Sequence, residues 1–164
     1  MTRATPIVLL AIACGAPTEP TGMARVRVVL ARSGDTVRFE VPVVAQRCGD
    51  GRGVLLHGAR EGQGVLVWLR GAYPPDTGAY PLLPRGDSVA LRGVIAAVRY
   101  QLGDVPHGLP LEDGSASVTR ASPELALNVR GLGIELSVAE QHTAELVLER
   151  VPLAPDTVPC QVRL

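Results

Sequence analysis

The chain has 164 residues, of which 16 are basic and 16 acidic, so its formal net charge at pH 7 is zero. A neutral chain of this length can bury one hydrophobic core, and it has no electrostatic reason to bind nucleic acid. Every basic residue is arginine, and the arginines are scattered rather than gathered in a patch. We therefore expect a single domain with no nucleic-acid partner.

The first residues have the anatomy of an export signal. Arg3 precedes the apolar run 7–13, and Cys14 follows a small alanine. A basic start, a short apolar stretch and a small residue at the cleavage site are typical of secretory signals. The run is far shorter than the roughly 20 apolar residues of a spanning helix. The alternative is a buried strand ending in a core cysteine, but the Pro- and Gly-rich stretch 15–22 is typical of a flexible tether.

The cysteine that follows this run resembles the lipid-attachment site of bacterial lipoproteins. The resemblance implies cleavage before Cys14 and acylation of its thiol, which would anchor the protein in a membrane. Residues 1–13 would then be the signal peptide, 14–23 the tether and 24–164 a single folded domain. The implied location is the bacterial cell envelope. It would be the outer membrane in a cell with two membranes, because Gly15 rather than Asp follows the cysteine.

Two further cysteines, Cys48 and Cys160, form an even pair in a chain expected to reach an oxidising compartment. We expect a disulfide between them, which would close almost the whole domain and hold the C-terminal segment. Two free buried thiols are one alternative. A metal site is another, but with one histidine added the two cysteines would still lack the ligands that zinc needs.

Beyond the tether, apolar and polar residues alternate with a period of two, which is typical of strands with one buried face. No stretch has the apolar stripe of a helix. The expected strands lie near residues 25–28, 36–43, 54–57, 65–69, 89–100, 115–119, 125–129, 134–138 and 145–151. About eight strands separated by Gly, Pro and Asp predict an all-β fold, an antiparallel β-sandwich or barrel.

Several positions predict local features. The segment 33–35 predicts a tight hairpin, and Pro42 predicts an edge strand or a bulge because it cannot donate to a β-ladder. Gly93 predicts a bend or a bulge that lets one long strand serve two sheets. Gly131 and Gly133 predict a break before the strand 134–138, and Trp68, which alternates with Leu66, predicts a core position.

A second resemblance rests on two short motifs. They are Gly78-Ala79-Tyr80-Pro81-Leu82 and Gly114-Ser115-Ala116-Ser117-Val118-Thr119. The chain here is similar to uncharacterised β-rich lipoproteins of bacterial envelopes, in which such motifs form strands. The Gly-x-Phe strand common in those proteins is replaced by Gly131-Leu132-Gly133-Ile134, without the aromatic residue. The resemblance supports the fold and implies no chemistry.

Two long connections are the candidate binding surfaces, because binding residues often lie on loops held by a rigid scaffold. The first, 71–81, carries Tyr73 and Tyr80. The second, 103–114, carries four polar candidates. They are Asp104, His107, Glu112 and Asp113. A metal ion could use such a loop, but the spacing matches no calcium-loop pattern, and we expect no metal and no cofactor.

Catalytic machinery is not evident in the sequence. There is no Gly-x-Ser-x-Gly motif, and the three histidines lie far apart in sequence. His57 falls in an apolar strand, His142 is interpreted as a turn residue, and His107 is the best placed because carboxylates lie near it. A hydrolase with an unrecognised site is the least favoured interpretation, so we expect no enzymatic activity.

The preferred hypothesis is a non-catalytic, membrane-anchored envelope lipoprotein that is structural or binds an envelope protein or glycan through its loops. The alternative is a lipocalin-like barrel that carries a small apolar ligand. A central apolar cavity would favour the carrier, and a filled core would oppose it. A convergent carboxylate–histidine cluster with shifted pKa values would favour an enzyme.

Overall fold

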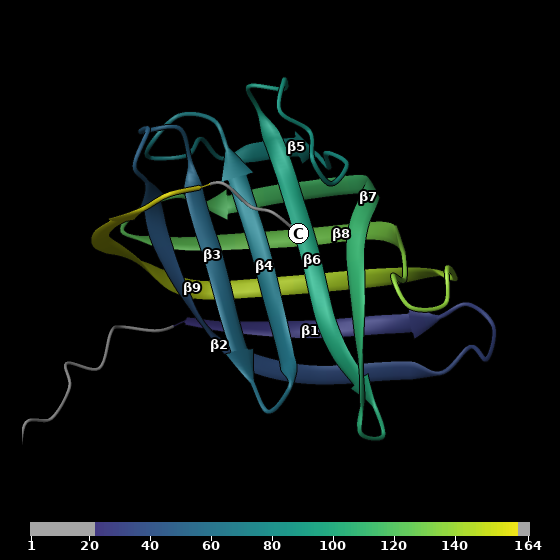
Figure 1. Cartoon of the computed structure of the whole chain (residues 1–164). Helices are drawn as coiled ribbons and strands as arrows, with labels where there is room; N and C mark the ends of the chain where they lie inside the picture. Colours follow the sequence, from purple (N-terminus) through teal and green to yellow (C-terminus); the bar gives the residue numbers. More distant parts are fainter. Residues whose placement is uncertain (1–21, 161–164) are drawn as a thin grey trace, which may run out of the picture.

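The computed structural model describes residues 22–160, which form nine β-strands and no helix (Figure 1). The all-β prediction is confirmed. None of these residues forms a helix that could span a membrane. The strands are β1 (Gly22–Leu30), β2 (Thr36–Cys48), β3 (Val54–Arg60), β4 (Gln63–Arg70), β5 (Gly78–Pro81), β6 (Gly93–Leu102), β7 (Val105–Arg120), β8 (Glu124–Ile134) and β9 (Gln141–Val158).

Eight of the nine strands close into an antiparallel barrel. Strands β1, β2, β3, β4, β6, β7, β8 and β9 pair in chain order, and β9 pairs back with β1. This is an up-and-down arrangement, in which closure leaves no free strand edge in the barrel. Strand β5 is the ninth strand and pairs with β7. In Figure 1, a front layer of β3, β4 and β6 crosses steeply over a back layer of β1, β8 and β9.

Two long strands pass from one layer to the other. Strand β2 pairs with β1 up to Val43 and with β3 from Val44 onward, so that Pro42 lies where the partner changes, in a closed barrel rather than at an edge. Strand β7 pairs with β6 up to Leu111 and with β8 from Leu111 onward, with an irregular register between Leu111 and Asp113. The two strands therefore form corners of the barrel.

The bend predicted at Gly93 is wrong. Gly93 begins β6, and residues 89–92 belong to the loop that follows β5, where Val89 and Leu91 are exposed. The backbone φ of Gly93 is +156°, and a Cβ there would collide with the side chain of Leu83. Glycine is required here by the close packing of the loop on the strand, which the sequence pattern alone does not distinguish from a bend.

The break predicted at Gly131 and Gly133 is also wrong. Strand β8 runs through both glycines to Ile134, and the residues 135–138, predicted as strand, form a loop instead. A Cβ on Gly133 would collide with the carbonyl oxygen of Pro110, and one on Gly131 would collide with Leu82. These glycines permit close packing within a continuous strand rather than ending it.

The inside of the barrel is filled. Side chains from all eight barrel strands form one apolar cluster, and most of its members are 0–3% exposed. A large internal cavity would leave accessible surface on these residues, so the centre is a packed core. Trp68 is not part of this core, contrary to prediction. Val65, Val67 and Leu69 of β4 point inward, whereas Trp68 is only half-buried and lies on the outer face.

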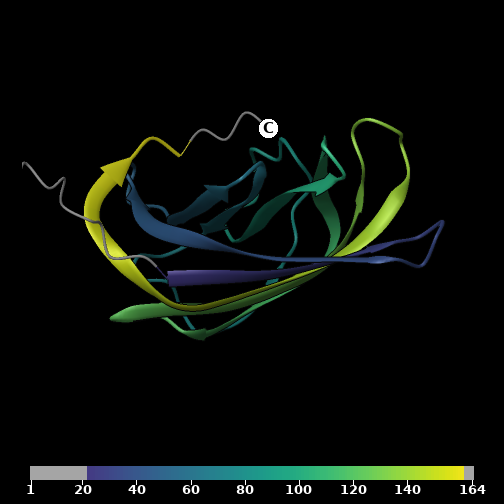
Figure 2. The same cartoon turned by 90° about the horizontal axis from the view of Figure 1, so that it is seen from below.

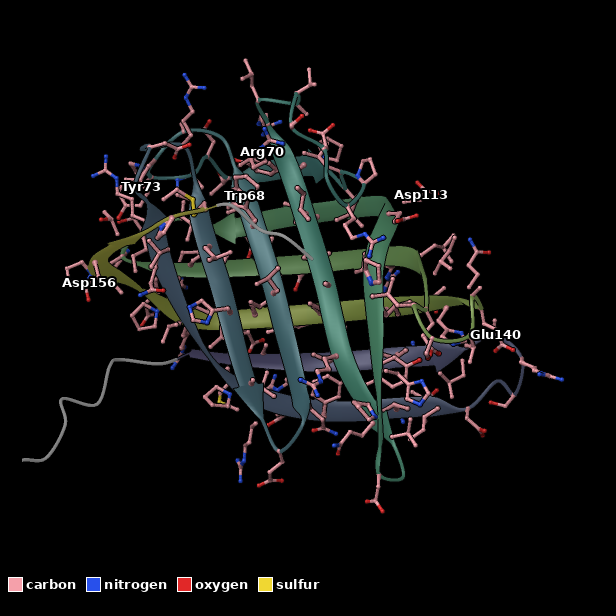
Figure 3. All side chains as sticks on the ribbon, in the orientation of Figure 1. Trp68, Arg70, Tyr73, Asp113, Glu140 and Asp156 are labelled. Atoms are coloured by element: carbon pink, nitrogen blue, oxygen red, sulfur yellow. A yellow bond between two sulfur atoms is a disulfide. The ribbon has the colours of Figure 1, made fainter. Side chains whose placement is uncertain are left out.

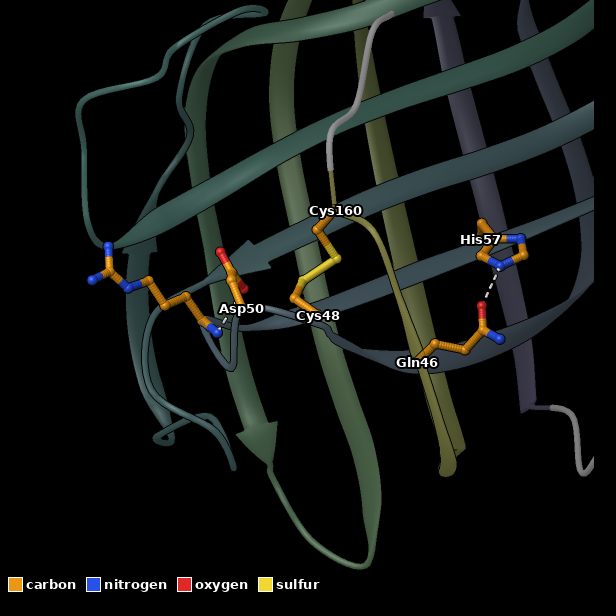
Figure 4. The surroundings of a disulfide bond; sticks show 6 residues. Gln46, Cys48, Asp50, His57 and Cys160 are labelled. Atoms are coloured by element: carbon orange, nitrogen blue, oxygen red, sulfur yellow. Dashed lines mark hydrogen bonds between the residues drawn. A yellow bond between two sulfur atoms is a disulfide. The ribbon is translucent and has the colours of Figure 1, made fainter.

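The predicted disulfide between Cys48 and Cys160 is present (Figure 4). The last part of β9 leaves β1 and pairs in parallel with the end of β2, from Ala45 to Cys48, and Figure 2 shows β9 curling from one layer toward the other. The disulfide ties the chain beyond β9 to the end of β2.

At the other end of the domain, β1 begins at Gly22, two residues before the expected boundary at 24. Cys14 lies outside the described residues.

Candidate functional site

The predicted loop 103–114 is mostly strand. Asp104 lies in the tight turn between β6 and β7, and Glu112 and Asp113 lie in the β7 corner, whereas His107 faces the inside of the barrel beside Tyr100. The four candidates therefore do not converge. Within residues 22–160, no group of three or more His, Cys, Asp or Glu side chains could hold a metal ion.

The two candidate tyrosines have structural contacts. Tyr80, in β5, is 2% exposed and donates a hydrogen bond from its hydroxyl to the carbonyl oxygen of Asp76 at 2.9 Å. Tyr73 is partly buried against the core, and the guanidinium of Arg47 lies 4.6 Å from its ring centre. Figure 3 shows Tyr73 in the loop beside the ends of the front strands. Burial removes these tyrosines from the exposed surface that the sequence predicted for them.

A buried carboxylate cluster, not predicted from the sequence, lies at the end of the barrel where a loop joins β8 to β9. Oε1 of Glu135 accepts hydrogen bonds from Nδ1 of His107 at 2.6 Å and from the hydroxyl of Ser137. Oε2 accepts hydrogen bonds from the hydroxyl of Tyr100 at 3.1 Å and from Nε2 of His142 at 3.3 Å. We call these five residues the Glu135 cluster.

The cluster keeps its central carboxylate ionised. Burial alone would raise the pKa of Glu135, which is 2% exposed, but the hydrogen bonds from Ser137, His107 and Tyr100 outweigh burial and lower its pKa to about 2. The pKa of Tyr100 is raised, because its phenol is buried and donates to the same carboxylate. A buried charge with several donors is a stable arrangement, since each donor replaces a lost water contact.

The two histidines of the cluster differ in their remaining contacts. Nδ1 of His142 accepts a hydrogen bond from the backbone N–H of Ala31 at 3.2 Å, so that Nε2 carries the proton donated to Glu135. The ring of His107 stacks on Tyr100, with 5.3 Å between ring centres. The prediction that His142 is a turn residue is wrong, because it is 3% exposed near the start of β9.

His57 lies in a strand, as the sequence predicts. It lies in β3, half-buried on the outer face, and its Nε2 hydrogen-bonds the side-chain oxygen of Gln46 at 2.9 Å (Figure 4). A histidine with a satisfied side-chain contact on a strand needs no catalytic explanation.

A pocket of about 460 Å³ lies on the outer face of the front layer. Leu66 of β4, Ala97 of β6 and Pro110 of β7 form its apolar floor, and the exposed Leu136 of the β8–β9 loop borders it. The N–H of Leu136 bonds the carbonyl oxygen of Gly108, which fixes this loop against β7. We call this hollow the outer pocket.

Positive charge borders the outer pocket. Arg99 of β6 and Arg85 of the β5–β6 loop line it together with His107, and no acidic residue lines it. Arg99 pairs across the sheet with Gly64 on one side and Gly108 on the other, so neither neighbouring strand places a side chain beside it. His107 is thus shared by the outer pocket and the Glu135 cluster.

The apolar outer face at the pocket could have been recognised from the sequence. In a half-exposed strand every second residue is polar, but the runs 54–56, 65–69 and 94–98 contain no charged residue at all. Such runs are typical of strands covered on both faces. The Glu135 cluster has no comparable pattern in the sequence, because the partners of Glu135 come from distant parts of the chain.

Comparison with protein-family models, with curated proteins and with solved structures gives no match for this chain.

Proposed function

We propose that the protein is a non-catalytic lipoprotein of the bacterial cell envelope, anchored by an acylated Cys14, whose barrel binds a small, largely apolar molecule in the outer pocket. The outer pocket is the observation that carries the binding role. Its volume of about 460 Å³ falls within the range of small-molecule sites, about 300–1,000 Å³. Its floor is apolar, which is the usual lining of such sites.

The packed interior decides where a ligand would bind. The barrel architecture is compatible with a lipocalin-like carrier, but here the inward positions are filled by Val, Leu and Ala side chains. A ligand would therefore bind on the outer face of β4, β6 and β7 rather than inside the barrel.

The envelope location is supported by the cysteines. A disulfide between Cys48 and Cys160 is typical of proteins in an oxidising compartment, such as the periplasm. The export signal that ends at Cys14 supports the same location. The disulfide and the export signal depend on different residues, so each supports the location independently.

The Glu135 cluster is better explained as structural than as catalytic. A hydrolytic triad needs the nucleophile beside the histidine, but Ser137 and His107 both bond the same oxygen of Glu135. The donors around Glu135 come from β6, β7, β9 and the β8–β9 loop, so the cluster fixes that loop over the end of the barrel.

Binding in the outer pocket is tested by filling it. We would use the full chain with Cys14→Ser, which cannot be acylated and needs no detergent, and titrate decanol by calorimetry. Decanol should bind, and Ala97→Phe should abolish binding because the ring would occupy the pocket floor. Ala79→Phe, the same change at an exposed position of β5, is the matched control. Decanol binding that survives Ala97→Phe would overturn the site assignment.

The anchor is tested by fractionation and mass spectrometry of the wild-type protein and of Cys14→Ala. The wild-type protein should be found in the membrane fraction, with an acylated cysteine as its first residue. Cys14→Ala should lose the acyl mass and leave the membrane fraction. A wild-type protein whose N-terminus is not an acylated cysteine would refute the anchor.

A further inference from the structure

We propose that the ligand of the outer pocket is a single-chain amphiphile with an anionic head group, such as a fatty acid, whose chain lies on the apolar floor and whose head group binds Arg99 and Arg85. This inference rests on the proposed function and adds the chemical class of the ligand.

The charges around the pocket favour an anion. Arg99 and Arg85 are exposed, and neither forms an ion pair with any residue between 22 and 160. An anionic head group in the pocket would meet two exposed guanidinium groups that have no acidic partner, which favours an anion over a cation.

Two exposed arginines of the back layer have acidic partners. There, Arg25 is bracketed by Glu40 and Glu149 at 3.1 and 3.2 Å, and Arg130 pairs with Glu145 at 2.7 Å. A second hollow of about 570 Å³ over this layer is lined by Arg130 and Glu145 together, so its charges are already compensated. The outer pocket lacks such acidic partners, which a bound anion would supply.

The apolar floor of the outer pocket favours a ligand with an alkyl chain. Leu66, Ala97 and Pro110 lie side by side on β4, β6 and β7, because Leu66 pairs with Ala97 and Ala97 with Pro110. Arg99 lies two residues beyond Ala97 on the same face of β6. An alkyl chain on this floor therefore has a guanidinium beside it, and guanidinium binds carboxylate through paired hydrogen bonds.

The test compares three ligands with the same ten-carbon chain. Decanoate, decanol and decyltrimethylammonium are titrated into the full chain with Cys14→Ser by calorimetry, below the concentrations at which they form micelles. We expect decanoate to bind more tightly than decanol, and the cation most weakly. Equal affinity for decanoate and decanol would overturn the anionic head group and leave the proposed function standing. Binding of none of the three would overturn both.

Variants then locate the head group. Arg99→Gln and Arg85→Gln should each weaken decanoate about two- to five-fold, the effect expected of one exposed ion pair, and leave decanol unchanged. Arg52→Gln is the matched control, because Arg52 is exposed in the β2–β3 turn and does not line the pocket. Decanoate binding that neither pocket variant weakens would overturn the proposal.

A bilayer surface is the competing source of anionic head groups. Vesicles of phosphatidylglycerol are therefore sedimented with the same protein. We expect no binding that depends on Arg99 and Arg85. If the protein sediments with the vesicles through Arg99 and Arg85 but does not bind decanoate, the pocket binds a membrane surface. This result would overturn the proposal that the ligand is a single amphiphile molecule.

Discussion

Replacing Glu135 by glutamine should remove a large, pH-dependent part of the stability. On folding, the pKa of this carboxyl falls from the ordinary 4.5 to about 2. At 1.36 kcal/mol per pH unit, the difference of about 2.5 contributes about 3 kcal/mol at pH 7. A lowered pKa stabilises the fold above the unfolded-state value of 4.5, and this stabilisation is lost as the pH falls toward 2. By pH 3, about 2 of the 3 kcal/mol should be gone.

Urea unfolding at pH 7, 5, 4 and 3 measures this contribution. Glu135→Gln should be less stable than wild type at pH 7 and should approach it at pH 3, because the glutamine side chain does not titrate. Glu112→Gln is the control, since Glu112 is exposed in β7 and makes no ion pair with any described residue. Parallel pH profiles for wild type and Glu135→Gln would refute the assignment of the buried charge.

Three further substitutions test the packing around the site. Joint Cys48→Ala and Cys160→Ala replacement should lower the urea midpoint by an amount corresponding to at most about 5 kcal/mol, because the disulfide joins residues 112 apart; an unchanged midpoint would contradict this. Tyr100→Phe should cost about 1–2 kcal/mol in the same assay, since it removes a buried hydroxyl that donates to Glu135, and a neutral result would argue against that hydrogen bond. Gly133→Ala should destabilise by about 1–3 kcal/mol through collision with Pro110, whereas Gly49→Ala, whose Cβ would have only an ordinary contact at 3.6 Å, should be neutral. Equal melting temperatures for these two glycine variants would refute the packing explanation.

The fold class was predictable because strand alternation depends on neighbouring residues. The hairpin at 33–35 and the alternation along 36–43 are confirmed as the β1–β2 turn and part of β2. The corners were not predictable in the same way. A strand that changes partner after Val43 or at Leu111 keeps its alternation, so only its partners identify the corner.

The main differences between the predicted and the observed strands lie at glycines. A glycine in a strand can mark a bend or break, or it can allow another part of the chain to approach closely. From the sequence alone, Gly93 predicts a bend and Gly131 predicts a break. Each instead allows a distant side chain, that of Leu83 or Leu82, to pack closely on the strand. Close approach depends on residues brought together only by folding, so a single sequence cannot separate it from a bend.

In the candidate site too, some features could be predicted from the sequence and others depend on contacts that form only on folding. The disulfide was predictable from an even count and the expected compartment, whereas the Glu135 cluster unites residues from positions 100 to 142 that share no motif. In the sequence, the neighbours of His107 that favour it as a site residue are Asp104 and Glu112. Its partner in space is Glu135, because in β7 the side chain of His107 faces inward, where the β8–β9 loop closes the barrel.

The two layers of the barrel differ on their outer faces, and this difference favours a ligand. On the back layer, outward positions of β1 and β9 carry charged residues such as Arg25 and Glu149, as expected of strands that face water. On the front layer, the outward residues of β4 and β6 include the apolar side chains of Leu66, Trp68, Ile95 and Ala97. At one end of this face, an ion pair of 2.9 Å joins Arg70 of β4 to Asp87 of the β5–β6 loop.

The rest of the front face, around Leu66 and Ala97, is the floor of the outer pocket. An open apolar surface is typical of an interaction site rather than of a solvated face, and here it lies beside arginines without acidic partners. If the outer pocket binds an amphiphile, polar replacement of its floor should leave folding intact, because Leu66 points away from the core. Leu66→Thr should therefore keep the melting temperature within a few degrees and weaken decanoate binding. A large loss of stability in this variant would mean that the apolar floor serves the fold instead of a ligand.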